Sequence, residues 1–192
     1  YPDVLDLRLR ISPDLVLADH SMQAIEAATI SHNRDGSYAD YRRLIESQLA
    51  RLSDLGKLAE FHSRFDAIYQ VADAYCWHDN YGYRAGVSHA EDACDLAQLF
   101  LNYGCDIDRR DAETNLTPLA KAILRGQPVP NWTKFIKFLI DAGADLCQSD
   151  PVETNPLNIA QHDSFYDEWT SGEHDEFIQL LEIARWRDYL RA

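Results

Sequence analysis

An internal repeat constrains the fold of this chain more than any other feature of its sequence. Residues 96–106, LAQLFLNYGCD, align with residues 135–145, FIKFLIDAGAD, so that the apolar positions, the glycine and the final aspartate coincide. Residues 177–181, FIQLL, continue the series at a similar spacing. A period of roughly 40 residues is typical of proteins built from small helical units, each of which buries its apolar face against the next.

A second set of residues repeats in step with the first. Residues 115–122, NLTPLAKA, align with residues 153–160, ETNPLNIA, at nearly the same separation. Thr117 can cap a helix while Pro118 occupies the first helical position, where its missing amide hydrogen costs nothing. Asn155 and the proline that follows it repeat this start signal. Each unit is therefore expected to contain a short helix that begins at a proline and a second, apolar helix.

Glycine and asparagine mark the ends and turns of these expected helices. Gly104 and Gly143 come directly after the apolar segments, where a left-handed residue closes the last helical turn. Gly126 follows the short helix of the middle unit in the same way. Asn115 stands before Leu-Thr-Pro, and asparagine is the next best residue after glycine for a positive φ.

This order of signals resembles the ankyrin repeat family, in which Thr-Pro-Leu opens a short helix and a leucine-rich second helix ends in Gly-Ala-Asp before a turn. The resemblance implies an all-α fold, an ankyrin-like helical repeat solenoid of about three repeats with an N-terminal helical cap. It covers about residues 60–185 and is specific in the middle repeat.

The chain also departs from the family pattern. The usual histidine after Leu is replaced by Ala120 and Asn158, so the family's histidine hydrogen-bond network is not expected. The periods exceed the family's roughly 33 residues. The extra length is expected between the two helices of each repeat, near residues 127–131 in the middle repeat and about residues 162–175 in the last.

Residues 1–60 carry helix signals of another kind. Helices are expected over residues 13–31, residues 38–55 and residues 58–77, and the last can double as the first helix of the first repeat. A stack of repeats exposes apolar faces at both ends, so we assign residues 1–60 to capping helices in preference to an independent domain. The repeats are expected at about residues 61–110, 111–149 and 150–192.

The formal charge of −14 is unevenly distributed. Residues 138–184 contain eleven acids and no lysine or arginine. Such a field repels phosphate backbones and speeds the encounter with a basic partner, so nucleic-acid binding is not expected. The alternative is a solvated acidic face that keeps the protein soluble.

No stretch reaches the roughly 18 to 20 apolar residues of a membrane span. We therefore expect no membrane interaction and a cytoplasmic location. The chain begins at Tyr1, which leaves open a processed or trimmed amino terminus and a lost targeting segment.

The four cysteines lack the spacing of a metal site. We expect them to be reduced, although their even number allows a disulfide. They are Cys76, Cys94, Cys105 and Cys147. Cys105 takes the alanine position of Gly-Ala-Asp and is expected to be a small buried residue.

Each expected inter-helix insertion carries aromatic residues, and acids accompany those of the last. Equivalent loops of stacked repeats line up along one edge, and aromatic anchors flanked by acids suit a basic, partly apolar partner. Cation–π contacts would contribute on the order of 1 kcal/mol each. Alternatively, these rings pack their own loops. The candidate partner-binding residues are Trp77, Tyr81, Tyr83, Trp132, Asp163, Phe165, Tyr166, Asp167, Glu168 and Trp169.

A second candidate surface is formed by the turns between repeats, around residues 106–113 and residues 148–153. The resemblance favours this concave surface, because ankyrin repeat proteins commonly bind partners there.

Catalysis is a third hypothesis. The densest cluster of acids and histidines could ligate a divalent cation or do acid/base work. It comprises His162, Asp163, Asp167, His174 and Asp175. No HExxH, glycine-rich phosphate loop or nucleophile elbow is present, so we expect no catalytic residue, no metal and no cofactor. Structural roles are expected for the other histidines considered, which are His20, His32, His62 and His89.

The sequence thus predicts a protein-protein interaction module that binds a partner protein, with a basic partner favoured, as a regulator or inhibitor. One alternative is an immunity or effector-type protein that occludes a partner's active site. The second alternative is a metal-dependent hydrolase-like enzyme that uses the loop at residues 162–175.

Overall fold

The computed structural model describes residues 13–31, 38–75, 89–125, 132–146, 155–162 and 171–189. Over these residues the regular structure is entirely α-helical and contains no strand, as expected. None of the helices in these ranges is long and apolar enough to cross a bilayer. The helices are α2 (Pro13–Ser31), α3 (Tyr38–Asp54), α4 (Leu58–Arg64), α5 (Ala67–Tyr75), α6 (His89–Asn102), α7 (Pro118–Arg125), α8 (Trp132–Asp141), α9 (Pro156–His162) and α10 (Ser171–Tyr189).

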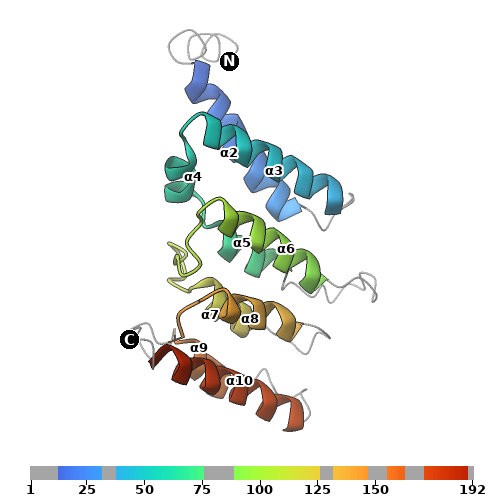
Figure 1. Ribbon diagram of the computed structural model, residues 1–192, viewed down its shortest axis with the longest axis vertical. Coiled ribbons are helices and arrows are strands. Elements are labelled where there is room, and N and C mark those ends of the chain that lie inside the picture. The colour runs from blue at the N-terminus through green and yellow to red at the C-terminus, as the bar shows by residue number, and fades with distance from the viewer. Residues whose placement is uncertain are drawn as a thin grey trace.

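The helices follow one another along the long axis of the molecule, from α2 and α3 at one end to α9 and α10 at the other (Figure 1). Helix α5 packs on α6, α7 packs on α8, and α9 packs on α10. Successive pairs are also in contact with one another, because α5 packs on α7, α7 packs on α9, and α6 packs on α8. The two segments that align in the sequence, residues 96–106 and 135–145, thus belong to adjacent helices and the turns that follow them.

The expected start signals act as helix caps. The hydroxyl of Thr117 accepts a hydrogen bond from the amide of Ala120 at 3.1 Å, and Pro118 is the first residue of α7. The side-chain oxygen of Asn155 accepts one from the amide of Asn158 at 3.4 Å before α9. These side chains satisfy amide groups that have no partner within the first helical turn.

The expected stop signals at Gly104 and Gly143 and the expected turn at Asn115 are also confirmed, whereas Gly126 lies outside the described residues. Gly104 and Gly143 have φ values of 84° and 102°, and Asn115 has a φ of 57°. After α6, the amide of Cys105 donates to the carbonyl of Phe100 at 3.1 Å, and the amide of Gly104 donates to Leu101 at 2.9 Å. This pair of bonds is the Schellman arrangement.

Helix α3 ends in the same arrangement, which the sequence analysis did not anticipate. Gly56 has a φ of 65°, and the amides of Gly56 and Lys57 donate to Ser53 and Leu52 at 3.0 and 2.8 Å. Helix α3 packs on both α2 and α6. Helix α3 therefore ends as α6 and α8 do and packs on comparable neighbours. It nevertheless lies in the segment that the sequence analysis assigned to the cap.

Side-chain bonds tie α3 to α6. The Tyr38 hydroxyl donates to the Asp95 carboxylate at 2.7 Å, and the Arg42 guanidinium pairs with the same carboxylate at 2.5 Å. The N-terminal helices are thereby joined to the rest of the molecule by polar contacts as well as by packing.

The prediction of one continuous helix over residues 58–77 is wrong. The chain forms α4 and α5 instead, and Phe65 between them has an extended backbone with φ −132° and ψ 120°. Asp66 stands directly before α5, as Thr117 stands before α7, and its carboxylate pairs with Arg109. Periodicity missed this break because both halves have helical patterns, whereas the partner of Asp66 comes from a distant part of the chain.

The last expected insertion is also shorter than residues 162–175, because α10 begins at Ser171. Residues 171–175 are therefore helical. The expected middle insertion lies outside the described residues.

A single apolar core runs through the described helices from α2 to α10. Phe61 of α4, Phe100 of α6 and Phe135 of α8 are fully buried within it. The rings of Phe61 and Phe100 stack with centroids 6.5 Å apart, which carries the core across from α4 to α6. Ile25 of α2 and Leu181 of α10, also fully buried, are members near its two ends.

Candidate functional site

The aromatic and acidic residues proposed from the sequence fall mainly outside the described structure. Trp132 is the first residue of α8, where only the backbone is described. The others lie beyond the described ranges, in the connections α5 to α6 and α9 to α10. They are Trp77, Tyr81, Tyr83, Asp163, Phe165, Tyr166, Asp167, Glu168 and Trp169. The aromatic edge therefore stays a prediction.

The described structure contains one of the two expected turn segments, the connection between α6 and α7. Its backbone is held by Asp111, whose carboxylate accepts hydrogen bonds from the amide of Thr114 at 2.7 Å and from its hydroxyl at 2.8 Å. The amide of Asp111 donates to the carbonyl of Leu116 at 3.1 Å, and Asn115 donates to Asp111 at 2.9 Å. The turn is thus held in place by its own polar groups.

Two further contacts tie this turn to its neighbours on either side. The carboxylate of Asp108 accepts a hydrogen bond at 2.8 Å from the amide of Asp145, which follows α8. The guanidinium of Arg109 pairs with Asp66, which lies between α4 and α5, and donates at 2.8 Å to the carbonyl of Ser63 in the last turn of α4. Three successive connections are therefore held next to one another.

The exposed part of the turn, here called the turn surface, consists of Asp106, Ala112, Glu113, Thr114 and Asn115. Its two charged side chains are both acidic. The neighbouring cations Arg109 and Arg110 are only partly exposed and are engaged within the protein, Arg110 with the carbonyl of Asn115 at 2.8 Å. The turn surface therefore presents negative charge to solvent.

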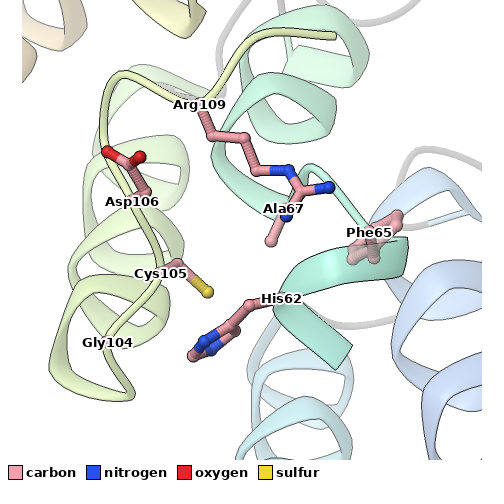
Figure 2. Close-up of a pocket in the computed structure, with 7 residues that line it drawn as sticks. All are labelled: His62, Phe65, Ala67, Gly104, Cys105, Asp106 and Arg109. Carbon is pink, nitrogen blue, oxygen red and sulfur yellow. The ribbon is translucent and has the colours of Figure 1, made fainter. Parts of the chain in front are cut away.

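A cavity of about 160 Å³ lies behind this turn, between α4 and the end of α6. Figure 2 shows the His62 ring and the Cys105 thiol facing each other across it. The Nε2 atom of His62 is buried and has no hydrogen-bond partner among the residues that the structure describes. His62 is therefore half-buried rather than an ordinary surface residue, and Cys105 lines a cavity rather than being fully buried. The lining residues are His62, Phe65, Ala67, Gly104, Cys105, Asp106 and Arg109.

The protonation states in the cavity do not suit a thiol-imidazole catalytic pair. Burial and the charge of Arg109 lower the pKa of His62, although a hydrogen bond with the Tyr103 backbone partly opposes them. Burial raises the pKa of Cys105 to about 12. A nucleophilic cysteine needs its thiolate form, which this raised pKa disfavours.

The two described cysteines are free, and the expected reduced state of all four stays a prediction. Cys94 and Cys105 form no disulfide, and burial raises the pKa of Cys94 to about 11. Cys76 and Cys147 lie outside the described residues.

A buried lysine beneath the turn was missed by the sequence analysis. Lys121 of α7 is only 7% exposed and pairs with Asp73 of α5 at 2.7 Å. Its ammonium lies 5.1 Å from the centre of the Tyr69 ring, whose hydroxyl is hydrogen-bonded to Thr114 at 3.0 Å. Burial alone would lower the pKa of Lys121, but the bonds to Asp73 and Tyr69 outweigh it and the pKa is raised. The one signal in the sequence was a lysine between Ala120 and Ala122.

Among the described residues, no group of three or more histidine, cysteine, aspartate or glutamate side chains is placed to hold a metal ion. The side chains of the acid and histidine cluster are not part of that description. They are His162, Asp163, Asp167, His174 and Asp175.

No protein-family model matches the chain, and none of the curated proteins or solved structures compared with it is significantly similar. Its own residues and contacts are therefore the basis for a function.

Proposed function

We propose that this chain is an ankyrin-like repeat protein that binds another protein, and that the turn surface is part of the binding site. The helix pairs α5/α6, α7/α8 and α9/α10 would be the repeats. Helices α2 and α3 would cover the open end of the stack.

The observation that carries the proposal is the alignment of successive turns by side-chain contacts. Asp108 reaches forward to the backbone of Asp145, and Arg109 reaches back to Asp66 and Ser63. The side chains of Asp108 and Arg109 therefore hold successive connections next to one another, instead of stabilising only the turn to which they belong. A row of rigid turns offers a partner an extended, preorganised surface, which lowers the entropy cost of binding.

The charge of the turn surface favours a basic partner. Asp106 and Glu113 are exposed, while the cations beside them are held by the protein's own oxygens. The eleven acids of residues 138–184 add to the same field. Electrostatic complementarity of this kind steers association and sets specificity.

The experiment is affinity purification with the whole chain as bait, at low and at higher salt, followed by titration of the purified partner. We expect a basic protein whose binding weakens as salt rises, because exposed charges are screened. Glu113→Lys should weaken binding about tenfold, which corresponds to about 1.4 kcal/mol. Glu26→Lys is the matched control, since Glu26 is an exposed acid on α2 and is not part of the turn surface.

Equal losses in the two variants would contradict a specific role for the turn surface, because both change the net charge identically. A partner that binds with the same affinity at every salt concentration would contradict the basic partner. The aromatic edge is tested separately by Tyr166→Ala with Trp169→Ala, which should weaken partner binding and leave the helical circular dichroism nearly unchanged. If the helical signal is lost instead, those rings are packing residues.

A further inference from the structure

A chain of side-chain hydrogen bonds connects the buried Lys121 to the turn surface. Lys121 bonds to Asp73 and to Tyr69 of α5, which is 4% exposed. The hydroxyl of Tyr69 lies 3.0 Å from the hydroxyl of Thr114. The same Thr114 hydroxyl donates at 2.8 Å to the carboxylate of Asp111. The chain therefore begins at a cation in the core and ends at an anion beside the turn surface.

The two ends of this chain fix the direction of its bonds. An ammonium group can only donate a hydrogen bond, and an ionised carboxylate can only accept one. The single proton of the Thr114 hydroxyl is used for Asp111, so Tyr69 donates to Thr114 and does not accept from it. All the bonds from Lys121 to Asp111 thus point the same way. Hydrogen bonds that are aligned in this manner polarise and strengthen one another.

The Thr114 hydroxyl is fully occupied within the protein. It donates to Asp111, and it accepts from the hydroxyl of Tyr69 at 3.0 Å and from the amide of Leu116 at 3.4 Å. One proton and two lone pairs are all that a hydroxyl has. Although Thr114 is exposed, its hydroxyl therefore holds the turn and is not available to a partner.

Glu113 offers an exposed carboxylate directly beside this chain. Its amide donates at 3.2 Å to Oδ2 of Asp111, the oxygen that also accepts from the amide and the hydroxyl of Thr114. Because all three bonds end on one oxygen, a change at the Thr114 hydroxyl also affects the backbone that carries the Glu113 side chain.

We propose that Tyr69 is a positioning residue for partner binding. Its hydroxyl fixes Thr114 and, above it, the carboxylate of Asp111. These two residues then set the direction in which Glu113 presents its carboxylate to a cation of the partner. A charge that is held in place loses less entropy on binding than a mobile one. This inference rests on the proposed function, because it takes the turn surface as the site that meets a basic partner.

Amide hydrogen exchange, followed by nuclear magnetic resonance on the whole chain, tests the positioning without any partner. Tyr69→Phe removes only the hydroxyl and keeps the ring beside Lys121. We expect the amide of Thr114, which donates to Asp111, to exchange about fivefold faster in this variant than in the wild type. The amide of Cys105, at the end of α6, is the internal reference and should stay within about twofold.

The comparison of two amides separates positioning from a general loss of stability. A general destabilisation accelerates the exchange of Thr114 and Cys105 together, whereas a loss of positioning accelerates that of Thr114 alone. Tyr41→Phe is the matched control, since it removes a hydroxyl from a half-buried tyrosine of α3 and should leave the exchange of Thr114 unchanged.

Two variants of Thr114 test the chain from its exposed end. Thr114→Val keeps the shape of the side chain without the hydroxyl, whereas Thr114→Ser keeps the hydroxyl. The probe is the basic protein that is recovered with the wild-type chain as bait. We expect Thr114→Val to bind it about fivefold more weakly, the loss of about one hydrogen bond, and Thr114→Ser to bind it as the wild type does. Thr133→Val, at an exposed position of α8, is the matched control.

A double-mutant cycle with the same partner tests whether Tyr69 acts through Glu113. Tyr69→Phe and Glu113→Gln should each weaken binding about fivefold. In the Tyr69→Phe background, Glu113→Gln should weaken binding only about twofold further, because the carboxylate is no longer held in place. Effects that multiply fully would show that the two residues act independently and would overturn the proposal.

Unchanged exchange of the Thr114 amide in Tyr69→Phe would also overturn the proposal. If Glu113→Lys weakens partner binding and Tyr69→Phe does not, this inference fails while the proposed function stands. If no partner binds the wild type, the proposed function fails, and with it the role of Tyr69 in binding.

Discussion

Two titratable side chains, the buried Lys121 and the half-buried His62, show how single residues shape the interior around the turn. Lys121 keeps its charge because Asp73 pairs with it and Tyr69 contacts it. Among the described residues, no carboxylate pairs with His62 and its Nε2 atom has no hydrogen-bond partner, while the charge of Arg109 opposes its protonation. A buried base without an opposite charge stays neutral, so the two residues respond to pH in opposite ways.

The first prediction concerns the pH dependence of stability through His62. Its pKa is lowered in the folded protein, and the unfolded value is about 6.5. Above that pH the histidine is neutral in both states. As the pH falls below it, the unfolded chain binds a proton that the folded chain resists, so the free energy of unfolding decreases until the folded pKa is passed.

We expect the wild type to lose more stability than His62→Gln between about pH 7.5 and about pH 5.5. Urea denaturation of both proteins at the two pH values measures this. Every other titrating group contributes equally to the two proteins, so the difference reports His62. The same pH dependence in both would show that His62 is protonated as readily in the folded state as in the unfolded one.

At the scale of helices, the boundaries depend on local chemistry that recurs along the chain. Helices α3, α6 and α8 are each followed by a glycine with positive φ, namely Gly56, Gly104 and Gly143. Helices α7 and α9 each begin at a proline that follows a capping side chain. The same signals produce the same boundaries because each involves only groups that are close together in the sequence.

The second prediction is that Thr117→Ala lowers the free energy of unfolding by about 1 kcal/mol. Thr117 is 1% exposed, so water does not replace the bond that its hydroxyl accepts from the amide of Ala120. Chemical denaturation of the wild type and the variant gives the difference. Thr133→Ala, at an exposed position of α8, is the control and should stay within about 0.5 kcal/mol of the wild type.

An unchanged stability in Thr117→Ala would mean that the hydroxyl contributes nothing to the start of α7. A loss well beyond about 2 kcal/mol, the upper end for a helix cap, would point to the packing of Thr117 rather than to its hydrogen bond.

At the scale of the whole molecule, one core joins the N-terminal helices to the rest. Ile25 of α2 and Leu49 of α3 belong to the same buried cluster as Phe100 of α6, and Tyr38 and Arg42 of α3 bind Asp95 of α6. An independent N-terminal domain would have a core of its own and few contacts across the boundary. The shared core argues against an independent N-terminal domain, and the assignment of these helices to a cap stays a prediction.

The third prediction is that Phe100→Ala destabilises the entire described chain by about 3–5 kcal/mol. The fully buried ring lies at the joint between α4 and α6, so its loss leaves a cavity in the shared core. We expect a single denaturation transition that shifts to lower urea concentration in the variant. Two transitions, of which only one shifts, would instead indicate that residues 1–60 unfold as a domain of their own.

Most helices and their ends could be read from the sequence, because capping, proline placement and positive φ depend on neighbouring residues. Pro118, Gly104 and Asn115 behave as their chemistry requires, whatever packs around them. The break at Phe65 could not be read in this way, because Asp66 pairs with Arg109 from a turn that is distant in the sequence.

The sequence did not determine which side chains are buried. Ile183 and Leu181 are equally apolar in the sequence, yet one is 68% exposed and the other is 0% exposed. Lys121 and His62 look like ordinary surface residues until α5 and the turn after α6 pack against them. Local chemistry decides where a helix begins and ends, but which of its faces meets water depends on helices that come from elsewhere in the chain.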